Sequence, residues 1–243
     1  MGKTTIVAGL ARVLALRGQK VLAIDADPAS NLALALGFPR NLRPMPIVAM
    51  KELIAERTGA PSGSMGGFFK LNPKVDDLPE KYSIEKDGIR LMVMGTVQKG
   101  GGGCVCPENV MVRALVAHLI LQKGEVVILD MEAGVEHLGR ATAQNVDKLV
   151  VVVEPGQRSL EVAQKIRGLA EDIGLKNIAA VGNKIRQDAD REFLRGRMPD
   201  LPFVGFLPFD PKIIEADLTG NPPYVDNPEF LRRMGEIVDR IVS

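Results

Sequence analysis

Six short apolar runs are spaced along the chain, and stretches long enough for a helix or a long loop separate most of them. Runs of this length without polar alternation are typical of strands buried on both faces of a parallel sheet. The runs occupy 20–25, 89–94, 125–130, 148–153, 177–182 and 203–207. Apolar residues recur at helical spacing between them, for example over 107–122 and 159–172. This alternation predicts an α/β fold with a mostly parallel sheet flanked by helices.

Composition excludes several classes of protein. The chain has 243 residues, 46% of them hydrophobic, and 31 basic against 30 acidic side chains leave a net charge of +1. This balance provides no global basic field for a nucleic acid or an anionic membrane. No apolar run approaches the roughly 20 residues of a membrane-spanning helix, and the two cysteines cannot form a disulfide scaffold. We expect a single domain over 1–243, with 38–88 as a helical and loop excursion, in a soluble cytoplasmic protein.

The first residues resemble half of a phosphate-binding loop. Gly2-Lys3-Thr4-Thr5 runs directly into a helical pattern, as in the second half of G-x-x-x-x-G-K-[ST]. In such a loop the backbone N–H groups and the helix amino end hold phosphates, the lysine neutralises them, and the hydroxyl binds Mg²⁺. The motif alone is a weak signal. It is strengthened by the next strand, which ends in Asp25-Ala26-Asp27-Pro28.

Carboxylates follow two of the predicted strands. Asp130 ends a buried apolar run, where an isolated charge is costly, and Mg²⁺ beside bound phosphates would compensate it. The alternative is that Asp130 caps the following turn. Asp27 could orient an attacking water, could cap a helix over 29–37, or could do both. Asp25 is interpreted as structural.

The chain contains a Cys-x-Cys motif after four consecutive glycines. Cys104 and Cys106 precede Pro107, a residue suited to the first turn of a helix, so both thiols lie near a helix amino end. This position favours the thiolate, which is the metal-binding form. Two thiolates are half of a tetrahedral Ni²⁺ or Zn²⁺ site, which a symmetric dimer would complete. The alternative is a pair of buried cysteines that act as small apolar residues.

Together these motifs resemble the deviant Walker A ATPases, which include MinD and the nitrogenase iron protein. The residues that carry the resemblance are Gly2-Lys3-Thr4-Thr5, Asp25-Ala26-Asp27-Pro28, Asp130-Met131-Glu132-Ala133-Gly134 and Asn183-Lys184. Within this family, Cys104-Val105-Cys106-Pro107-Glu108-Asn109, taken together with the run from Asp130 to Val135-Glu136-His137-Leu138, is similar to the CooC type. Those proteins are accessory ATPases for nickel insertion into carbon monoxide dehydrogenase, with relatives that serve acetyl-CoA synthase.

The resemblance implies a role for each matching residue. Lys3 would contact the phosphates during catalysis, Thr4 would bind Mg²⁺, Thr5 would bind an inner phosphate, and Asp27 would orient the hydrolytic water. Asp130 would hold Mg²⁺ through water, and Cys104 with Cys106 would bind Ni²⁺ or Zn²⁺ between two subunits. The residues expected around the ATP adenine are Asn183, Pro208 and Asp210. The family implies an ATP-driven homodimer with carbon monoxide dehydrogenase as its client.

The motif departs from the family pattern at its amino end. The family loop reads roughly G-K-G-G-x-G-K-T-T and follows the first strand of the sheet, whereas here the sequence starts at Met1-Gly2. We therefore expect an N-terminally truncated form that lacks the first strand and part of the phosphate loop, and that binds nucleotide poorly as written.

The chain could instead be a MinD-like regulatory or positioning ATPase. Such a protein would need no paired thiolates, so the Cys-x-Cys motif favours a metallochaperone that assists nickel insertion. The tail over 228–243 has an apolar face and a polar face of mixed sign, which favours a helix packed on the core over a membrane anchor.

Overall fold

The strands form two sheets in the computed structural model, which describes residues 2–60, 68–95, 106–121, 124–132 and 145–243. The first sheet has the order β2-β3-β1-β4 and the second has the order β5-β6-β7. All pairs are parallel except β2 with β3. The strands are β1 (Val21–Ala26), β2 (Ile84–Lys86), β3 (Ile89–Val93), β4 (Val126–Met131), β5 (Leu149–Val153), β6 (Ile178–Ile185) and β7 (Phe203–Pro208).

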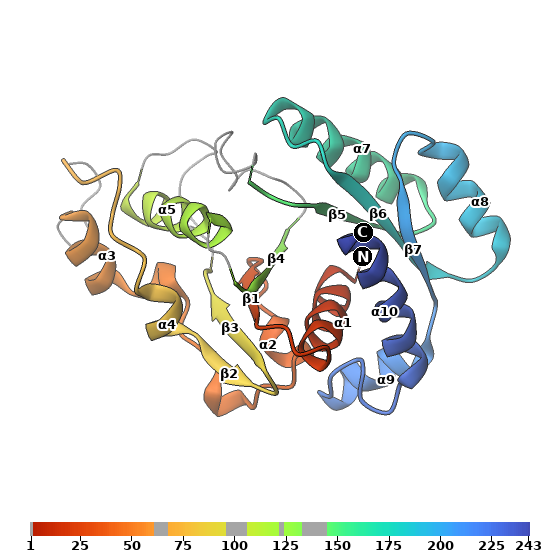
Figure 1. The fold of residues 1–243 in the computed structure, drawn as a ribbon, viewed down its shortest axis with the longest axis horizontal. Helices are drawn as coiled ribbons and strands as arrows, with labels where there is room; N and C mark the ends of the chain where they lie inside the picture. Colours follow the sequence, from red (N-terminus) through yellow and green to blue (C-terminus); the bar gives the residue numbers. More distant parts are fainter. Residues whose placement is uncertain (1, 61–67, 96–105, 122–123, 133–144) are drawn as a thin grey trace.

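Helices flank both sheets, as the sequence predicts (Figure 1). The α-helices described are α1 (Lys3–Leu16), α2 (Leu32–Ala35), α3 (Lys51–Thr58), α4 (Leu78–Tyr82), α5 (Pro107–Leu121), α7 (Gln157–Asp172), α8 (Asp188–Arg197), α9 (Pro211–Thr219) and α10 (Pro228–Val242). Two short 3₁₀ turns, Arg40–Leu42 and Ile47–Ala49, lie between α2 and α3. The described parts of the 38–88 segment, 38–60 and 68–88, contain short helices, 3₁₀ turns and loops and lead into the edge strand β2.

The helices α1 and α10 pack against each other and cover one face of both sheets. One continuous apolar cluster contains Ile6 and Leu10 of α1, Met234 of α10, Val152 of β5 and Val204 of β7. Gly9 lets the two helices approach closely, because a Cβ there would lie 2.8 Å from Cγ of Met234. Separate clusters fill the opposite faces of the first and second sheets.

The structure confirms the core-packing interpretation of the tail and corrects some element boundaries. Phe230, Met234, Ile237 and Val238 of α10 are buried. The helix predicted over 29–37 is confined to α2, and its N-cap is Asn31, so Asp27 does not cap it. The strand β2 and the helices α8 and α9 were not predicted, because their sequences are short or polar and lack a strong apolar period.

Candidate functional site

The amino end of α1 offers backbone donors to an anion. Gly2 is the N-cap residue and has left-handed backbone angles, with φ of 77°. The first turn carries no acidic side chain, and no side chain in the described part of the chain caps it. The first N–H groups of an α-helix have no partner within the helix. They therefore remain available to an anion beside Lys3, Thr4 and Thr5, whose side chains are partly exposed.

Two aspartates lie side by side on the central strands of the first sheet. Asp25 of β1 is in register with Asp130 of β4. The Asp25 carboxylate is fully buried and accepts hydrogen bonds from the backbone N–H of Asp27 at 3.2 Å, from the Ser30 hydroxyl at 2.7 Å and from the Leu32 N–H at 3.0 Å. Asp25 therefore orders the loop between β1 and α2.

Asp130 has a different environment from Asp25. Only 1% of its surface is exposed, and neither carboxylate oxygen accepts a hydrogen bond within the described residues. Burial raises the pKa of Asp130 to about 6, an effect that Thr4 and Lys3 oppose and the charges of Asp25 and Asp27 increase. A buried carboxylate without partners beside a hydroxyl and a lysine fits a Mg²⁺ site, because Mg²⁺ prefers oxygen ligands and keeps several waters.

Asp27 lies in the loop that Asp25 orders. Its side chain is partly exposed, and its carboxylate accepts the N–H of Ala29 at 2.9 Å in a local turn. Asp27 therefore closes this local turn and does not begin a helix, since the N-cap of α2 is Asn31.

The second sheet brings Asn183 to the head of α1. Asn183 is buried on β6, and a Cβ added to Gly2 would lie 2.5 Å from its Nδ2 atom. The next residue, Lys184, has a left-handed backbone with φ of 57° and pairs with Glu154 at 2.9 Å. The carboxyl-terminal part of β6 thus lies beside Gly2, and ligands of open α/β sheets bind at the carboxyl ends of the strands.

The other two residues expected around adenine lie at the end of β7. Pro208 is in register with Ile185 of β6, two residues after Asn183. Asp210 is the N-cap of α9, where its carboxylate accepts the Lys212 N–H at 3.0 Å and the Asn227 side-chain amide at 2.6 Å. Both Asp210 oxygens therefore accept hydrogen bonds that connect the start of α9 to Asn227. The sequence did not predict this structural role.

The structure describes one of the two cysteines of the Cys-x-Cys motif. Cys106 is partly exposed immediately before α5, and Pro107 is the first residue of that helix, as predicted. Cys104 lies outside the described residues. Among the described residues, no cluster of three or more histidine, cysteine or acidic side chains could hold a metal ion.

Sequence reasoning also missed Ser30, Glu154 and Asn227, which support Asp25, Lys184 and Asp210 respectively. Ser30 lies five residues after Asp25, so a turn motif could have indicated it. Glu154 and Asn227 come from distant parts of the chain, and only the tertiary fold brings them to their partners. No described helix is long and apolar enough to cross a membrane.

Comparisons with known proteins agree with this arrangement. The family model "CobQ/CobB/MinD/ParA nucleotide binding domain" matches residues 1–224. The chain is 48% identical over 222 residues to the carbon monoxide dehydrogenase accessory protein CooC of Rhodospirillum rubrum, covering 90% of this chain and 84% of that protein. It is 44% identical over 230 residues to an uncharacterized ATP-binding protein of Methanocaldococcus jannaschii, covering 93% of this chain and 88% of that protein.

Solved structures show the same fold at lower identity. MinD in the MinC:MinD cell division complex of Aquifex aeolicus superposes with a TM-score of 0.71 at 21% identity, covering 99% of this chain and 90% of that chain. MinD of Pyrococcus horikoshii, complexed with Mg-ADP, superposes with a TM-score of 0.66 at 19% identity, covering 99% and 90%. The chain belongs to the CobQ/CobB/MinD/ParA family of nucleotide-binding ATPases and is a CooC-like member of it.

Proposed function

We propose that this chain is an ATP-hydrolysing maturation factor that helps to insert nickel into carbon monoxide dehydrogenase. The observation that carries the ATPase part is the buried Asp130 carboxylate, which has no hydrogen-bond partner among the described residues and lies beside Thr4 and Lys3. The client is inferred from the 48% identity to the CooC protein.

Each residue at the phosphate end of the site has its own role. Lys3 and the first N–H groups of α1 bind phosphate oxygens, and Thr5 contacts an inner phosphate. Thr4 and Asp130, the latter through water, would hold Mg²⁺, which when bound neutralises charge on the phosphates. Asp27 accepts a hydrogen bond from the attacking water and so orients it towards the terminal phosphate.

The adenine end of the site is formed by the second sheet. Asn183 has an amide that can donate to and accept from a base edge. Pro208 supplies an apolar contact at the end of the neighbouring strand. Asp210 keeps the loop after β7 in place through its bonds to Lys212 and Asn227. The position of Asn183 against Gly2 couples the base end of the site to the phosphate end.

The metal carried to the client would bind to Cys104 and Cys106. Two such pairs from a homodimer would supply four thiolates to one Ni²⁺ or Zn²⁺ ion. Cys106 directly precedes α5, whose residues Met111 and Leu115 pack in the same cluster as Leu129 of β4. A shift of β4 on nucleotide binding would therefore reach the cysteine end of α5 through packed side chains.

Activation of nickel-free carbon monoxide dehydrogenase tests the proposal. The natural protein, ATP, Mg²⁺ and Ni²⁺ are added to the nickel-free enzyme, and the rate of CO oxidation is measured. We expect activation to fall at least ~10-fold in Lys3→Gln, because the lysine would stabilise the negative charge on the transferred phosphoryl group. Lys51→Gln, an exposed lysine on α3, is the matched control and should activate fully.

Three results would count against this proposal. Activation that is equal with and without ATP would remove the ATPase from the mechanism. Activation of nickel-free acetyl-CoA synthase, with none of carbon monoxide dehydrogenase, would assign the protein to that client. Binding to another protein with no nickel transfer to either enzyme would favour a MinD-like regulatory role.

A further inference from the structure

The 220–227 segment, which connects α9 to α10, contacts the end of α2. Tyr224 in this segment donates a hydrogen bond from its hydroxyl to the Leu36 carbonyl at 3.2 Å, across 188 residues of sequence. Pro222 is buried against Gly37, where an added Cβ would lie 2.7 Å from the proline Cγ atom. The segment therefore holds the end of α2 through one directed hydrogen bond and one close apolar contact.

Tyr224 is itself fixed by its surroundings. Its ring packs against the apolar cluster that α1 and α10 share. The guanidinium carbon of Arg12 in α1 lies 5.7 Å from the ring centroid, within the range of a cation–π contact. On the other side of the helix end, Lys86 of β2 donates to the Gly37 carbonyl at 2.7 Å. Carbonyls at the end of a helix have no partner within it, and here two distant side chains supply one.

The other end of the 220–227 segment is bonded to the loop after β7. Asn227 is buried and begins α10, where its side-chain oxygen accepts the Phe230 N–H at 3.1 Å. Its amide nitrogen donates to the Asp210 carboxylate at 2.6 Å. Asp210 lies at the base end of the proposed nucleotide site. One short segment thus contacts both this loop and α2.

The loop that carries Asp27 runs between Asp25 and α2. The Asp25 carboxylate accepts the backbone N–H of Asp27 at 3.2 Å and that of Leu32, the first residue of α2, at 3.0 Å. The loop is thus fixed at its start by Asp25, and the helix that follows it is fixed at its end by Tyr224. Because α2 has only four residues, its own hydrogen bonds cannot hold it in place, and its position depends on contacts with the rest of the chain.

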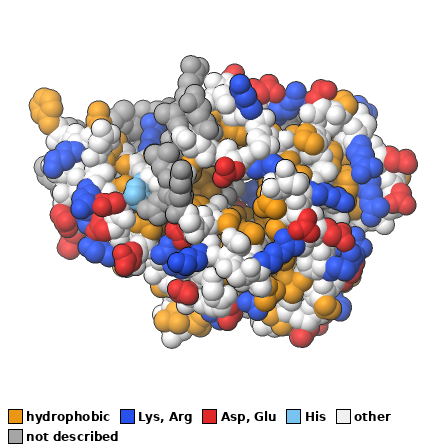
Figure 2. Space-filling view, in the orientation of Figure 1, with side chains coloured by type: hydrophobic (Ala, Val, Ile, Leu, Met, Phe, Trp, Pro, Cys, Tyr) orange, Lys and Arg blue, Asp and Glu red, His pale blue; other side chains and the backbone are white. Residues whose placement is uncertain are grey.

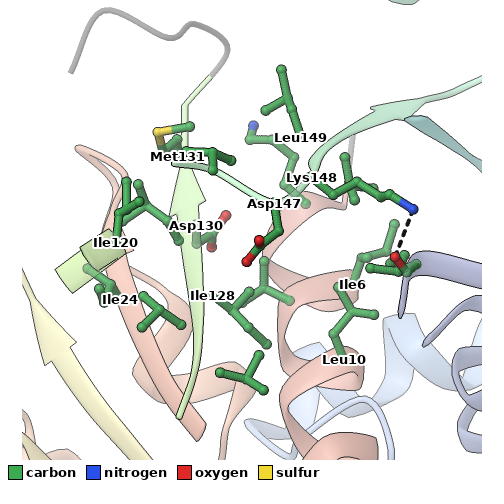
Figure 3. Close-up of a pocket in the computed structure, with 18 of the residues that line it drawn as sticks. Ile6, Leu10, Ile24, Ile120, Ile128, Asp130, Met131, Asp147, Lys148 and Leu149 are labelled. Atoms are coloured by element: carbon green, nitrogen blue, oxygen red, sulfur yellow. Dashed lines mark hydrogen bonds between the residues drawn. The ribbon is translucent and has the colours of Figure 1, made fainter. Parts of the chain in front are cut away.

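Asp25 places the start of this loop beside the phosphate end of the proposed site. It is in register with Asp130, which lines a pocket together with Lys3 and Ile6 of α1. Asp130 borders this pocket from β4 and Ile6 borders it from α1 (Figure 3). The space-filling view shows a hollow near the middle of the molecule (Figure 2). The Asp27 loop is therefore anchored to the phosphate end directly, and to the base end through α2 and the 220–227 segment.

We propose that Tyr224 is a positioning residue for ATP hydrolysis, which holds α2 and the Asp27 loop at a fixed place relative to the Asp210 loop. The inference rests on the proposed function, in which Asp27 orients the attacking water. Tyr224 lies outside the groups that would contact the nucleotide, so loss of its hydroxyl leaves nucleotide binding intact. The loss widens the range of positions open to Asp27, and a group that orients a reactant is effective only when it is held in place.

Amide hydrogen exchange tests the contact without any need for ATP hydrolysis. Tyr224→Phe keeps the ring and removes only the donor. We expect the amides of 32–37 to exchange at least ~3-fold faster in this variant and those of 178–185 on β6 to be unchanged. Tyr82→Phe is the matched control, because it removes the other tyrosine hydroxyl of the chain, in α4 on the opposite face of the first sheet. Equal exchange at 32–37 in the two variants would show that the Tyr224 hydroxyl does not hold α2.

Steady-state ATP hydrolysis by the natural protein tests the consequence for the reaction. The rate is expressed per ADP-binding site, counted by calorimetric titration, so that unfolded chains do not contribute. We expect Tyr224→Phe to lower kcat about 3- to 10-fold with KM for ATP unchanged within ~2-fold, since the nucleotide contacts remain. Tyr82→Phe should leave both constants unchanged. An unchanged kcat in Tyr224→Phe, or a loss that appears only in KM, would overturn the positioning role.

A double variant tests whether Tyr224 acts through Asp27. In Asp27→Asn, the residual rate should not fall further when Tyr224→Phe is added, because the group that Tyr224 positions is already lost. A further fall of about 3- to 10-fold would show that Tyr224 acts elsewhere and would overturn the inference. If Asp27→Asn hydrolyses ATP at the full rate, the proposed role of Asp27 fails and the positioning role fails with it. Hydrogen exchange separates that outcome from one in which Tyr224 does not hold α2.

Discussion

Asp130 is a buried carboxylate whose protonation should depend on whether a cation is bound. Its partner in register, Asp25, has three hydrogen bonds, whereas Asp130 has none among the described residues. Burial raises the pKa of Asp130 to about 6, so near neutral pH the side chain is ionised at a cost in folding free energy. A bound divalent cation would remove most of this cost, because an opposite charge favours the ionised form.

This environment predicts a pH dependence of stability. The folded-state pKa of Asp130 exceeds the unfolded-state value, so the native state retains a proton that the unfolded state loses between about pH 4 and pH 6. The free energy of unfolding should therefore fall by about 3 kcal/mol as pH rises through this window, in the absence of Mg²⁺ and nucleotide.

Urea denaturation at several pH values measures this dependence. Asp130→Asn should lose the fall between about pH 4 and pH 6, because asparagine does not titrate. Asp76→Asn, at an aspartate with an exposed side chain, is the matched control and should retain the fall. An Asp130→Asn protein with the same pH dependence as the unsubstituted chain would show that Asp130 is not the group responsible.

Gly2 predicts a second effect at the scale of one residue. Gly2 and Gly18 both have φ of 77°, but a Cβ at Gly2 would lie 2.5 Å from Asn183, and one at Gly18 would have nothing within 4 Å. Alanine at either position carries the left-handed backbone cost of roughly 1–2 kcal/mol. Gly2→Ala should also displace Asn183 and weaken ADP binding at least ~10-fold, whereas Gly18→Ala should leave ADP affinity unchanged. Calorimetric titration with ADP measures the affinity of each variant. Equal ADP affinities of Gly2→Ala and Gly18→Ala would contradict the proposed role of Asn183 in nucleotide binding.

The positions of the charged site residues could be predicted from sequence, but their surroundings could not. Asp25 and Asp130 follow from apolar runs that end in acidic residues. Periodicity does not show that one carboxylate has three donors and the other has none, since the donors come from a loop whose path depends on the fold. The bonds of Asp210 to α9 and Asn227 are also tertiary, so its structural use was not foreseeable from the loop sequence.

At the scale of secondary structure, the contact between α1 and α10 holds the common core together. Phe230 and Met234 of α10 reach the backbone of α1 at Gly9. Arg17 at the end of α1 donates to Asp239 of α10 at 2.7 Å, but both side chains are largely exposed, so the pair contributes little. Close packing at Gly9 therefore matters more than this ion pair.

Gly9→Ala should be destabilising although alanine is the better helix former. The new methyl group would lie 2.8 Å from Cγ of Met234 and 2.9 Å from Cζ of Phe230, and such overpacking typically costs about 1–3 kcal/mol. Gly168→Ala in α7 is the matched control, because a Cβ there meets nothing within 4 Å. It should raise the free energy of unfolding by about 0.5–1 kcal/mol through helix propensity alone. Urea denaturation gives both values, and a stabilising Gly9→Ala would contradict the described packing.

The elements that the sequence could predict are those with a strong apolar pattern. The six predicted runs correspond to β1, β3, β4, β5, β6 and β7, because interior strands need continuous apolar residues. The edge strand β2 has the sequence Ile-Glu-Lys and is set by its pairing with β3. The helix α8 contains mostly charged residues and buries only Asp190 and Leu194. Its sequence therefore has too few apolar residues to show a helical period.

At the scale of the whole molecule, two sheets share one core but not one hydrogen-bonded ladder. The cluster on the α1 and α10 side contains residues from both sheets. Asn183 of β6 lies beside Gly2, and Asp130 at the end of β4 lies near Thr4 and Lys3. Under the proposed function both sheets would contribute to the nucleotide site, the first through Asp25 and Asp130 and the second through Asn183.

The central claim is that a nucleotide-binding dimer carries a metal on its Cys-x-Cys motif. The most direct measurement is metal content per chain together with oligomeric state, on the natural protein and on a Cys104→Ala/Cys106→Ala variant. The account predicts about one Ni²⁺ or Zn²⁺ per two chains, lost in the variant, because four thiolates complete a tetrahedral site. A metal-free protein that still dimerises with ATP, or a variant that retains its metal, would contradict it.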